Sequence, residues 1–226
     1  MKILAIASQK GGTGKSTTSI HISSAATKAG LKVLLVDADH NSSSALFWGR
    51  ERNEDEPLVV TAFPEDSDKI DIEESELIEK LDFFKEAGEN DGYDLMVIDC
   101  PPYVNKLAIH ATSMADFTII PVRPKFNDLQ TLYKTISRVE KPFNILLSQC
   151  QPKVSGIESG KTQEARRLIE ENEMIVVPVQ ITNRESYSDS LNGGYSVLEY
   201  EPKGKASEEV LQLWNWIKKE MNLGEV

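Results

Sequence analysis

Cysteine is scarce in this sequence, and long apolar runs are absent. Its 226 residues include two cysteines, Cys100 and Cys150, which lie far apart in apolar stretches. This usage predicts buried, reduced thiols and argues against a disulfide framework or a cysteine metal site. No stretch approaches the roughly 18 apolar residues of a membrane-spanning helix, and the apolar run after Lys2 is too short for a secretory signal. We therefore expect a soluble, cytoplasmic protein.

Positive charge is also in short supply, with 25 lysines and arginines against 36 aspartates and glutamates. The excess is local, because residues 51–92 hold 16 acidic and 4 basic side chains while the rest of the chain is close to neutral. We interpret this block as a solvated loop and an exposed helix face, with a partner-binding surface as the alternative. The net charge of −11 therefore does not exclude a nucleic-acid partner.

Short apolar runs alternate with helical stretches along the chain. The runs lack period-2 alternation, which is typical of strands covered on both faces. They span residues 2–7, 32–36, 58–62, 94–98, 117–122, 143–148 and 174–181, and the helices expected between them span 15–29, 43–50, 75–87, 127–139 and 162–171. This pattern predicts a single α/β domain over residues 1–226: a doubly wound, mostly parallel sheet with helices on both faces. Ligands are expected at the carboxyl ends of its strands.

A last helix is predicted over residues 206–221. Its apolar positions follow helical spacing and form one face, made of Val210, Leu213, Trp214, Ile217 and Met221. A helix lying on a membrane would carry a polar face rich in lysine and arginine, whereas this one carries three glutamates beside two lysines. We therefore expect the stripe to pack on the core; Trp216 lies off the stripe and has no evident role.

The stretch "SQKGGTGKST", Ser8 to Thr17, follows the first apolar run and begins a helix. Glycines 11, 12 and 14 allow the backbone to wrap with its N–H groups inward, and the helix start adds a positive dipole end, so phosphate oxygens fit there. We expect Lys15 to reach the β- and γ-phosphates, Ser16 to bind Mg²⁺ and the Thr17 amide to meet the α-phosphate. The predicted nucleotide-binding residues are Lys10, Gly11, Gly12, Thr13, Gly14, Lys15, Ser16 and Thr17. The common pattern GxxxxGK[ST] has glycine at position 9, where this chain has Gln9 followed by Lys10.

Carboxylates follow two other predicted strands, in "VDADHNSS" and "VIDCPP". Because the carboxyl ends of parallel strands share one edge of a sheet, both segments should meet the phosphate loop. Mg²⁺ prefers oxygen ligands and keeps several waters, so we expect Ser16 and the phosphates to coordinate it directly, and Asp37 and Asp99 to hold it through its waters. Asp39 is placed to orient or deprotonate an attacking water.

Three segments together carry a family resemblance. "QKGGTGKST" resembles the deviant Walker A box of the ParA/MinD family of ATPases, "VDADHNSS" its Asp-x-Asp motif and "LMVIDCPP" its Walker B strand. The similarity continues through "FTIIPVRPKFNDLQTL" and the segment from Val177 to Val210, and the tryptophan in "SSSALFWGR" is similar to small plasmid-partition ParA proteins. The resemblance implies that Lys10 is the family's second lysine, which reaches phosphates held by the other subunit of a dimer.

The resemblance also implies a function. ATP with Mg²⁺ would close a homodimer, the dimer would bind nonspecific DNA, and a ParB-like activator would trigger hydrolysis by a site in which Lys10, Lys15 and Asp39 are catalytic. Such a switch partitions or positions a plasmid, a chromosome or another cargo, and associates with the nucleoid when bound to ATP. Basic residues available for DNA phosphates are Arg123, Lys125, Lys134, Arg138 and Lys141, and a further set of Arg166, Arg167, Lys203, Lys205, Lys218 and Lys219.

Other functions share this nucleotide core. A membrane-associated MinD-like ATPase is disfavoured because the last helix is not basic, so no stable membrane association is expected. A metabolic or metal-cluster-carrier enzyme is disfavoured because the chain has no CxxC pair. A positioner of a protein compartment or of a conjugation complex stays open, since partners choose the cargo.

Two segments differ from the family pattern. His40 and Asn41 follow Asp39 where a Pro-Gln pair is usual, which leaves the geometry of that loop undetermined. The stretch "SQCQPK" lacks the asparagine often found near adenine, so the sequence assigns no base-contacting residue.

Overall fold

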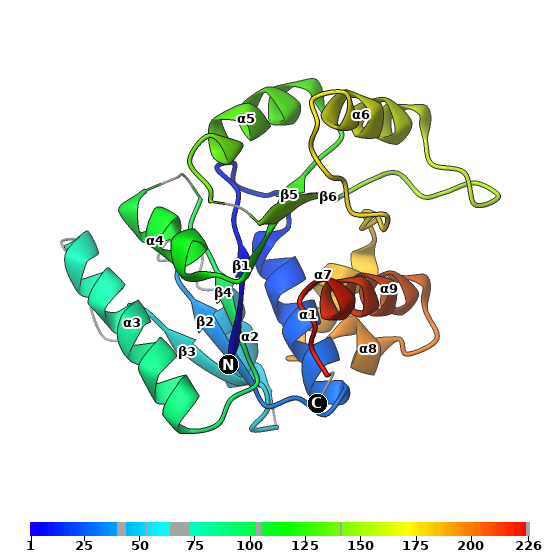
Figure 1. Cartoon of the computed structure of the whole chain (residues 1–226). Helices are drawn as coiled ribbons and strands as arrows, with labels where there is room; N and C mark the ends of the chain where they lie inside the picture. The colour runs from blue at the N-terminus through cyan, green and yellow to red at the C-terminus, as the bar shows by residue number, and fades with distance from the viewer. Residues whose placement is uncertain (40–43, 53, 64–72, 103–104, 141, 225–226) are drawn as a thin grey trace.

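Six parallel strands form one sheet in the computed structural model, which describes residues 1–39, 44–52, 54–63, 73–102, 105–140 and 142–224 (Figure 1). The strands are β1 (Lys2–Ile6), β2 (Val33–Asp37), β3 (Leu58–Thr61), β4 (Leu95–Asp99), β5 (Phe117–Val122) and β6 (Phe143–Leu147). Their order is β3-β2-β4-β1-β5-β6, and every neighbouring pair is parallel. This arrangement confirms the predicted doubly wound fold class.

Helices cover both faces of the sheet (Figure 1). On one face lie α1 (Lys15–Lys28), α2 (Ser44–Glu51), α7 (Glu185–Asn192), α8 (Val197–Tyr200) and α9 (Lys205–Glu220). On the other face lie α3 (Glu74–Asn90), α4 (Lys106–Met114), α5 (Phe126–Ile136) and α6 (Gly160–Glu170). Alternate strand residues enter opposite cores, as Leu4 and Ala5 of β1 do, which explains why the strands read as continuous apolar runs.

The apolar run 174–181 does not form a continuous seventh strand, contrary to expectation. It pairs with β6 and the residues after it only through isolated bridges, Ile145 to Val176 and Cys150 to Thr182. Pro178 lies between the two bridges and has no N–H to donate, which interrupts the ladder. The helices α4, α7 and α8 were also not anticipated, because they are short.

The last helix, α9, packs its apolar stripe into the core. All five stripe residues are buried in the cluster that also holds α1, as predicted. Trp216 lies off the stripe because its ring packs against Phe117 of β5, with ring centroids 5.8 Å apart. Among the described helices, none is long and apolar enough to cross a membrane.

The two cysteines are buried and free. Burial raises the pKa of the Cys150 thiol to about 12 and that of Cys100 further. Both thiols therefore stay protonated near neutral pH and act as small apolar side chains, as the sequence suggested.

Strand register brings the chemical residues to one edge. Asp37 at the end of β2 lies opposite Asp99 at the end of β4. Ile6 at the end of β1 also pairs with Asp99, and the phosphate loop starts immediately after β1. The carboxyl ends of three adjacent strands thus converge on the start of α1.

Candidate functional site

The loop between β1 and α1 has the backbone shape of an anion seat. Gly12 and Gly14 have φ angles of 69° and 90°, a left-handed conformation that side chains disfavour. Gly14 is the N-cap of α1 and supplies no side-chain cap, and the first turn of the helix holds no acidic residue. The positive end of α1 is therefore available to an anion.

The side chains at the start of α1 occupy the positions expected from the motif. Lys15 is the first residue of the helix and is buried, while Ser16 and Thr17 follow it and are partly exposed. The hydroxyls of Thr18 and Ser19 donate hydrogen bonds to the carbonyls of Gly14 and Lys15, which satisfies buried polar atoms within the helix. A buried ammonium next to a helix N-terminus attracts a polyanion such as a triphosphate.

Two residues after β6 brace the loop from the side. The Ser148 hydroxyl donates to the Thr13 carbonyl at 2.6 Å, and the Gln149 side-chain amide donates to the Gly12 carbonyl at 2.7 Å. These bonds turn the carbonyls outward, so the loop N–H groups remain for a ligand. The sequence did not point to these two residues; the only signal was their place directly after a parallel strand.

Removing this brace gives a testable effect on binding. Ser148→Ala is expected to weaken nucleotide binding roughly 3- to 10-fold, since one buried hydrogen bond that preorganises the loop contributes about 1 kcal/mol. Isothermal calorimetry with ADP measures the change. Ser113→Ala is the matched control, because the Ser113 hydroxyl donates to the His110 carbonyl at 2.8 Å on the exposed side of α4. Equal affinities for Ser148→Ala and the control would rule out the bracing role.

Asp99 is fully buried at the end of β4. Burial, reinforced by the nearby Asp37 carboxylate, raises the pKa of Asp99 to about 7. One carboxylate oxygen accepts from the Ser19 hydroxyl at 3.3 Å, while Oδ2 has no hydrogen-bond partner among the described residues. A buried oxygen without a partner at the phosphate seat is what a hydrated cation or its water would satisfy.

Asp37 is held by backbone donors. Its two oxygens accept from the N–H groups of Asp39 and Leu46, each at 3.0 Å, which ties the end of β2 to the first turn of α2. Burial raises the pKa of Asp37 despite these bonds. Asp39 is also buried, beside Asp37. His40 and Asn41, whose effect the sequence left open, lie outside the described residues.

The donor set fits Mg²⁺. Ser16 lies at the loop, and its hydroxyl is among the neighbouring groups that lower the pKa of Asp99 against the effect of burial. Among the residues that the structure describes, no group of three or more His, Cys, Asp and Glu side chains could hold a metal alone. Phosphate oxygens and waters would therefore complete the shell, as Mg²⁺ prefers, with Ser16 and Asp99 on the protein side. The two oxygens of Asp37 already accept backbone hydrogen bonds, so Asp37 would act through water.

Lys10 does not lie over the phosphate seat. Its ammonium forms a salt bridge with Oδ1 of Asp128, in the first turn of α5, and Arg123 Nε bonds the other oxygen of the same carboxylate. Burial opposes ionisation of Asp128, but the hydrogen bonds and charges of Arg123 and Lys10 outweigh it and lower its pKa. Asp128 was not anticipated as a site residue; its one signal was that it is an acid within a basic stretch.

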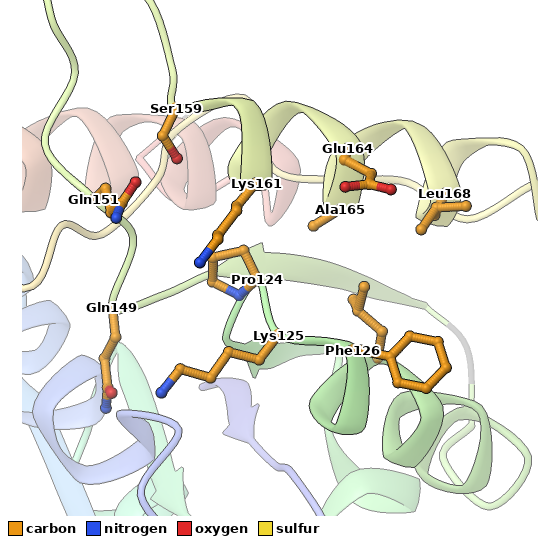
Figure 2. Close-up of a pocket in the computed structure, with 11 residues that line it drawn as sticks. Pro124, Lys125, Phe126, Gln149, Gln151, Ser159, Lys161, Glu164, Ala165 and Leu168 are labelled. Carbon is orange, nitrogen blue, oxygen red and sulfur yellow. The ribbon is translucent and has the colours of Figure 1, made fainter.

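A pocket of about 460 Å³ lies between α5 and α6, close to the loop brace (Figure 2). Lys161 extends into it from above Pro124 and Lys125 from below, and Gln149 borders it while reaching toward the phosphate loop. None of residues 8–17 lines it. It is therefore separate from the phosphate seat.

Some of the basic residues proposed for DNA are exposed, and others are paired with acids. Lys125, Lys134 and Arg138 are exposed on or beside α5. Arg166 and Arg167 instead form salt bridges with Glu158 and Glu171. Lys141 lies outside the described residues. The exposed residues, which also include Lys203, Lys205 and Lys219, are thus stronger candidates for contacts with phosphates than the paired arginines.

Comparisons with known proteins agree with this geometry. Residues 2–178 match the family described as ATPase MipZ. The chain is 28% identical over 248 residues to the sporulation initiation inhibitor protein Soj of Bacillus subtilis, covering 94% of this chain and 96% of that protein. It is 33% identical over 174 residues to the chromosome partitioning protein ParA of Caulobacter vibrioides, covering 64% of this chain and 65% of that protein.

A third relative and two solved structures extend the comparison. The chain is 29% identical over 213 residues to the maintenance of carboxysome distribution protein A of Gloeobacter kilaueensis, covering 92% of this chain and 88% of that protein. Its fold is similar to that of the Cyanothece McdA(D38A)-ATP complex, with a TM-score of 0.71, 20% identity, and 100% and 98% of the two chains covered. The Aquifex aeolicus MinC:MinD complex gives the same TM-score and identity over 97% and 96%. The names of these relatives refer to sporulation, chromosome partitioning and carboxysome distribution, so they do not single out plasmid-partition proteins.

Proposed function

Because the chain belongs to the MipZ family of ATPases, within the ParA/MinD group of deviant Walker P-loop proteins, we propose that it is an ATP-driven dimerisation switch that positions a cargo in the cell. The observation that carries this proposal is that two lysines of one loop lie in different places. Lys15 is buried at the start of α1, where the phosphate seat lies, while Lys10 lies outside the seat on the flank of α5.

Within one chain, the loop binds and orients ATP. The N–H groups at the start of α1 and the Lys15 ammonium hold the phosphates, and the bonds from Ser148 and Gln149 keep the loop in shape. When bound, Mg²⁺ would neutralise phosphate charge, held by Ser16 and Asp99 with Asp37 acting through water. The carboxylate of Asp39 would position the attacking water.

Lys10 acts between chains in this proposal. It lies five positions before Lys15, and its ammonium faces away from its own phosphate seat toward α5. Two ATP molecules brought face to face repel each other, and a lysine from each partner would offset that repulsion and stabilise charge that develops during phosphoryl transfer. A homodimer that forms only with ATP follows.

The names of the relatives indicate the kind of cargo. They carry names for chromosome partitioning and carboxysome distribution, and we propose that this chain likewise places a chromosome, a plasmid or a protein compartment. In this scheme the ATP dimer binds nonspecific DNA in the cytoplasm, and a ParB-like activator stimulates hydrolysis and releases it. The exposed cations of α5 favour DNA over a membrane, because the apolar face of α9 is used in the core.

Nonspecific DNA binding tests the proposal. Filter binding of duplex DNA is compared with ATP, with ADP and without nucleotide, across salt concentrations. Binding with ATP alone, weakening steeply with salt, is the expected result. DNA binding that is equally strong with ATP, with ADP and without nucleotide would contradict the proposal. So would ATP-dependent binding to liposomes without binding to DNA.

A pair of matched variants locates the DNA surface. Lys134→Gln combined with Arg138→Gln is expected to weaken ATP-dependent binding and to lower the log–log salt slope by about one per lost phosphate contact. Lys28→Gln removes an exposed cation at the far end of α1 and is expected to leave both quantities unchanged.

A further inference from the structure

Asp128 joins two cations at the rim of the phosphate loop. Oδ1 bonds the Lys10 ammonium and Oδ2 bonds Arg123 Nε, so each oxygen faces a different positive charge. The Asp128 side chain is 1% exposed, Arg123 is 18% exposed and Lys10 is 35% exposed. The carboxylate is thus enclosed, while the lysine that bonds it still borders solvent.

The space on the inner side of this pair, between the loop and α5, is closed to other ligands. The cavity between the loop and α5, lined by Lys10, Thr13 and Asp128 among others, holds only about 10 Å³. That is room for one water at most, and a phosphate group does not fit. A phosphate can therefore reach Lys10 only from its solvent side, and a Lys10 ammonium that extends to a phosphate there moves away from the enclosed Asp128 carboxylate.

Arg123 sets the free-energy cost of moving the Lys10 ammonium away from Asp128. A buried carboxylate stripped of its only cation is strongly destabilised, whereas one that keeps a hydrogen-bonded guanidinium stays compensated. Arg123 is fixed beside the loop, with Nη1 3.9 Å from where a Cβ on Gly12 would lie. It can remain with Asp128 when Lys10 swings away.

We propose that Asp128 and Arg123 are positioning residues for Lys10: Asp128 docks Lys10 in the single chain, and Arg123 compensates Asp128 once Lys10 has moved to the partner chain. This inference rests on the proposed dimerisation. The Lys10–Asp128 contact stabilises the monomer and so opposes dimer formation. Arg123 reduces the cost of breaking that contact. Asp128 and Arg123 therefore have opposite effects on dimer stability.

A purely structural role makes a different prediction. If the cluster only fastened α5 to the loop, as the bond from the Gln9 N–H to the Thr135 hydroxyl at 3.4 Å also does, any substitution would loosen the site and weaken the dimer. Opposite signs for two substitutions in one cluster therefore separate positioning from fastening.

The test measures the dimer dissociation constant by sedimentation velocity with Mg²⁺ and the non-hydrolysable analogue AMPPNP. Asp128→Asn is expected to tighten the dimer about 10-fold, and Arg123→Gln is expected to weaken it about 10-fold, because undocking then strips a buried carboxylate. The double variant should match Asp128→Asn, since no charge remains to compensate. Asp116→Asn is the control: it removes a 3.0 Å pair with Lys2 at the other end of the sheet and should leave the dimer unchanged.

Each result is decisive. A weaker or unchanged dimer in Asp128→Asn, or a dimer of Arg123→Gln as tight as the wild type, overturns the inference. A double variant as weak as Arg123→Gln means that Arg123 contacts the nucleotide itself, which also overturns it. If either single variant is thermally unstable, the sign of the other decides. A wild type that stays monomeric refutes the proposed dimerisation, whereas a wild-type dimer with the wrong variant signs refutes only this inference.

Discussion

Replacing Lys15 by alanine is expected to reduce ATP affinity by a factor of about 100 or more. Lys15 is 6% exposed and lies at the first position of α1, so its ammonium is desolvated and next to the unpaired N–H groups of the helix. Charge-assisted bonds to a triphosphate in such a place are stronger than surface contacts, and several would be lost together. Isothermal calorimetry with ATP and Mg²⁺ measures the loss.

A second lysine of the same helix provides the comparison. Lys28 lies in the last turn of α1 and is exposed, so Lys28→Ala changes the net charge equally without touching the seat. It is expected to bind ATP as the wild type does. Wild-type affinity in Lys15→Ala would show that the loop does not hold the phosphates in the proposed way.

Replacing Asp39 by alanine is expected to separate binding from turnover. Asp39 is buried beside Asp37, whose Oδ1 accepts the Asp39 N–H at 3.0 Å, and its carboxylate would orient the attacking water. Loss of a positioned base lowers a rate by roughly 10²- to 10⁴-fold. A phosphate-release assay should therefore show almost no hydrolysis, and size-exclusion chromatography should show an ATP dimer that persists.

The control for this variant removes a carboxylate far from the site. Asp116 directly precedes β5 and forms a salt bridge with Lys2. The variant Asp116→Ala removes this pair and is expected to keep the wild-type rate. Hydrolysis at the wild-type rate in Asp39→Ala would remove Asp39 from the water-positioning role. A strictly monomeric profile with ATP would remove the switch.

The parts of the site fixed by short motifs were predictable from sequence. Lys15, Ser16 and Asp99 are placed by their distances from strand ends, and parallel strands with their carboxyl ends at one edge must bring them together. The six strands were predictable for a related reason, since apolar runs covered on both faces admit few other structures.

The contacts that depend on side chains from remote segments were not predictable. Ser148 and Gln149 reach the loop only because β6 ends beside β5, and Asp128 meets Lys10 across 118 residues of sequence. Trp216 breaks the period of its helix because Phe117 of a distant strand offers it a ring to pack on. The strand expected over residues 174–181 was wrong for a local reason, because one proline interrupts the strand pairing that the apolar composition favours.

Light scattering of Asp39→Ala with ATP and Mg²⁺, with and without the added change Lys10→Ala, tests the cross-chain role of Lys10 most directly. With hydrolysis blocked, the single variant should show twice the monomer mass. The double variant should bind ATP through Lys15 and stay at the monomer mass, because no lysine crosses to the partner. A double variant that forms the same dimer at the same concentration would contradict the account.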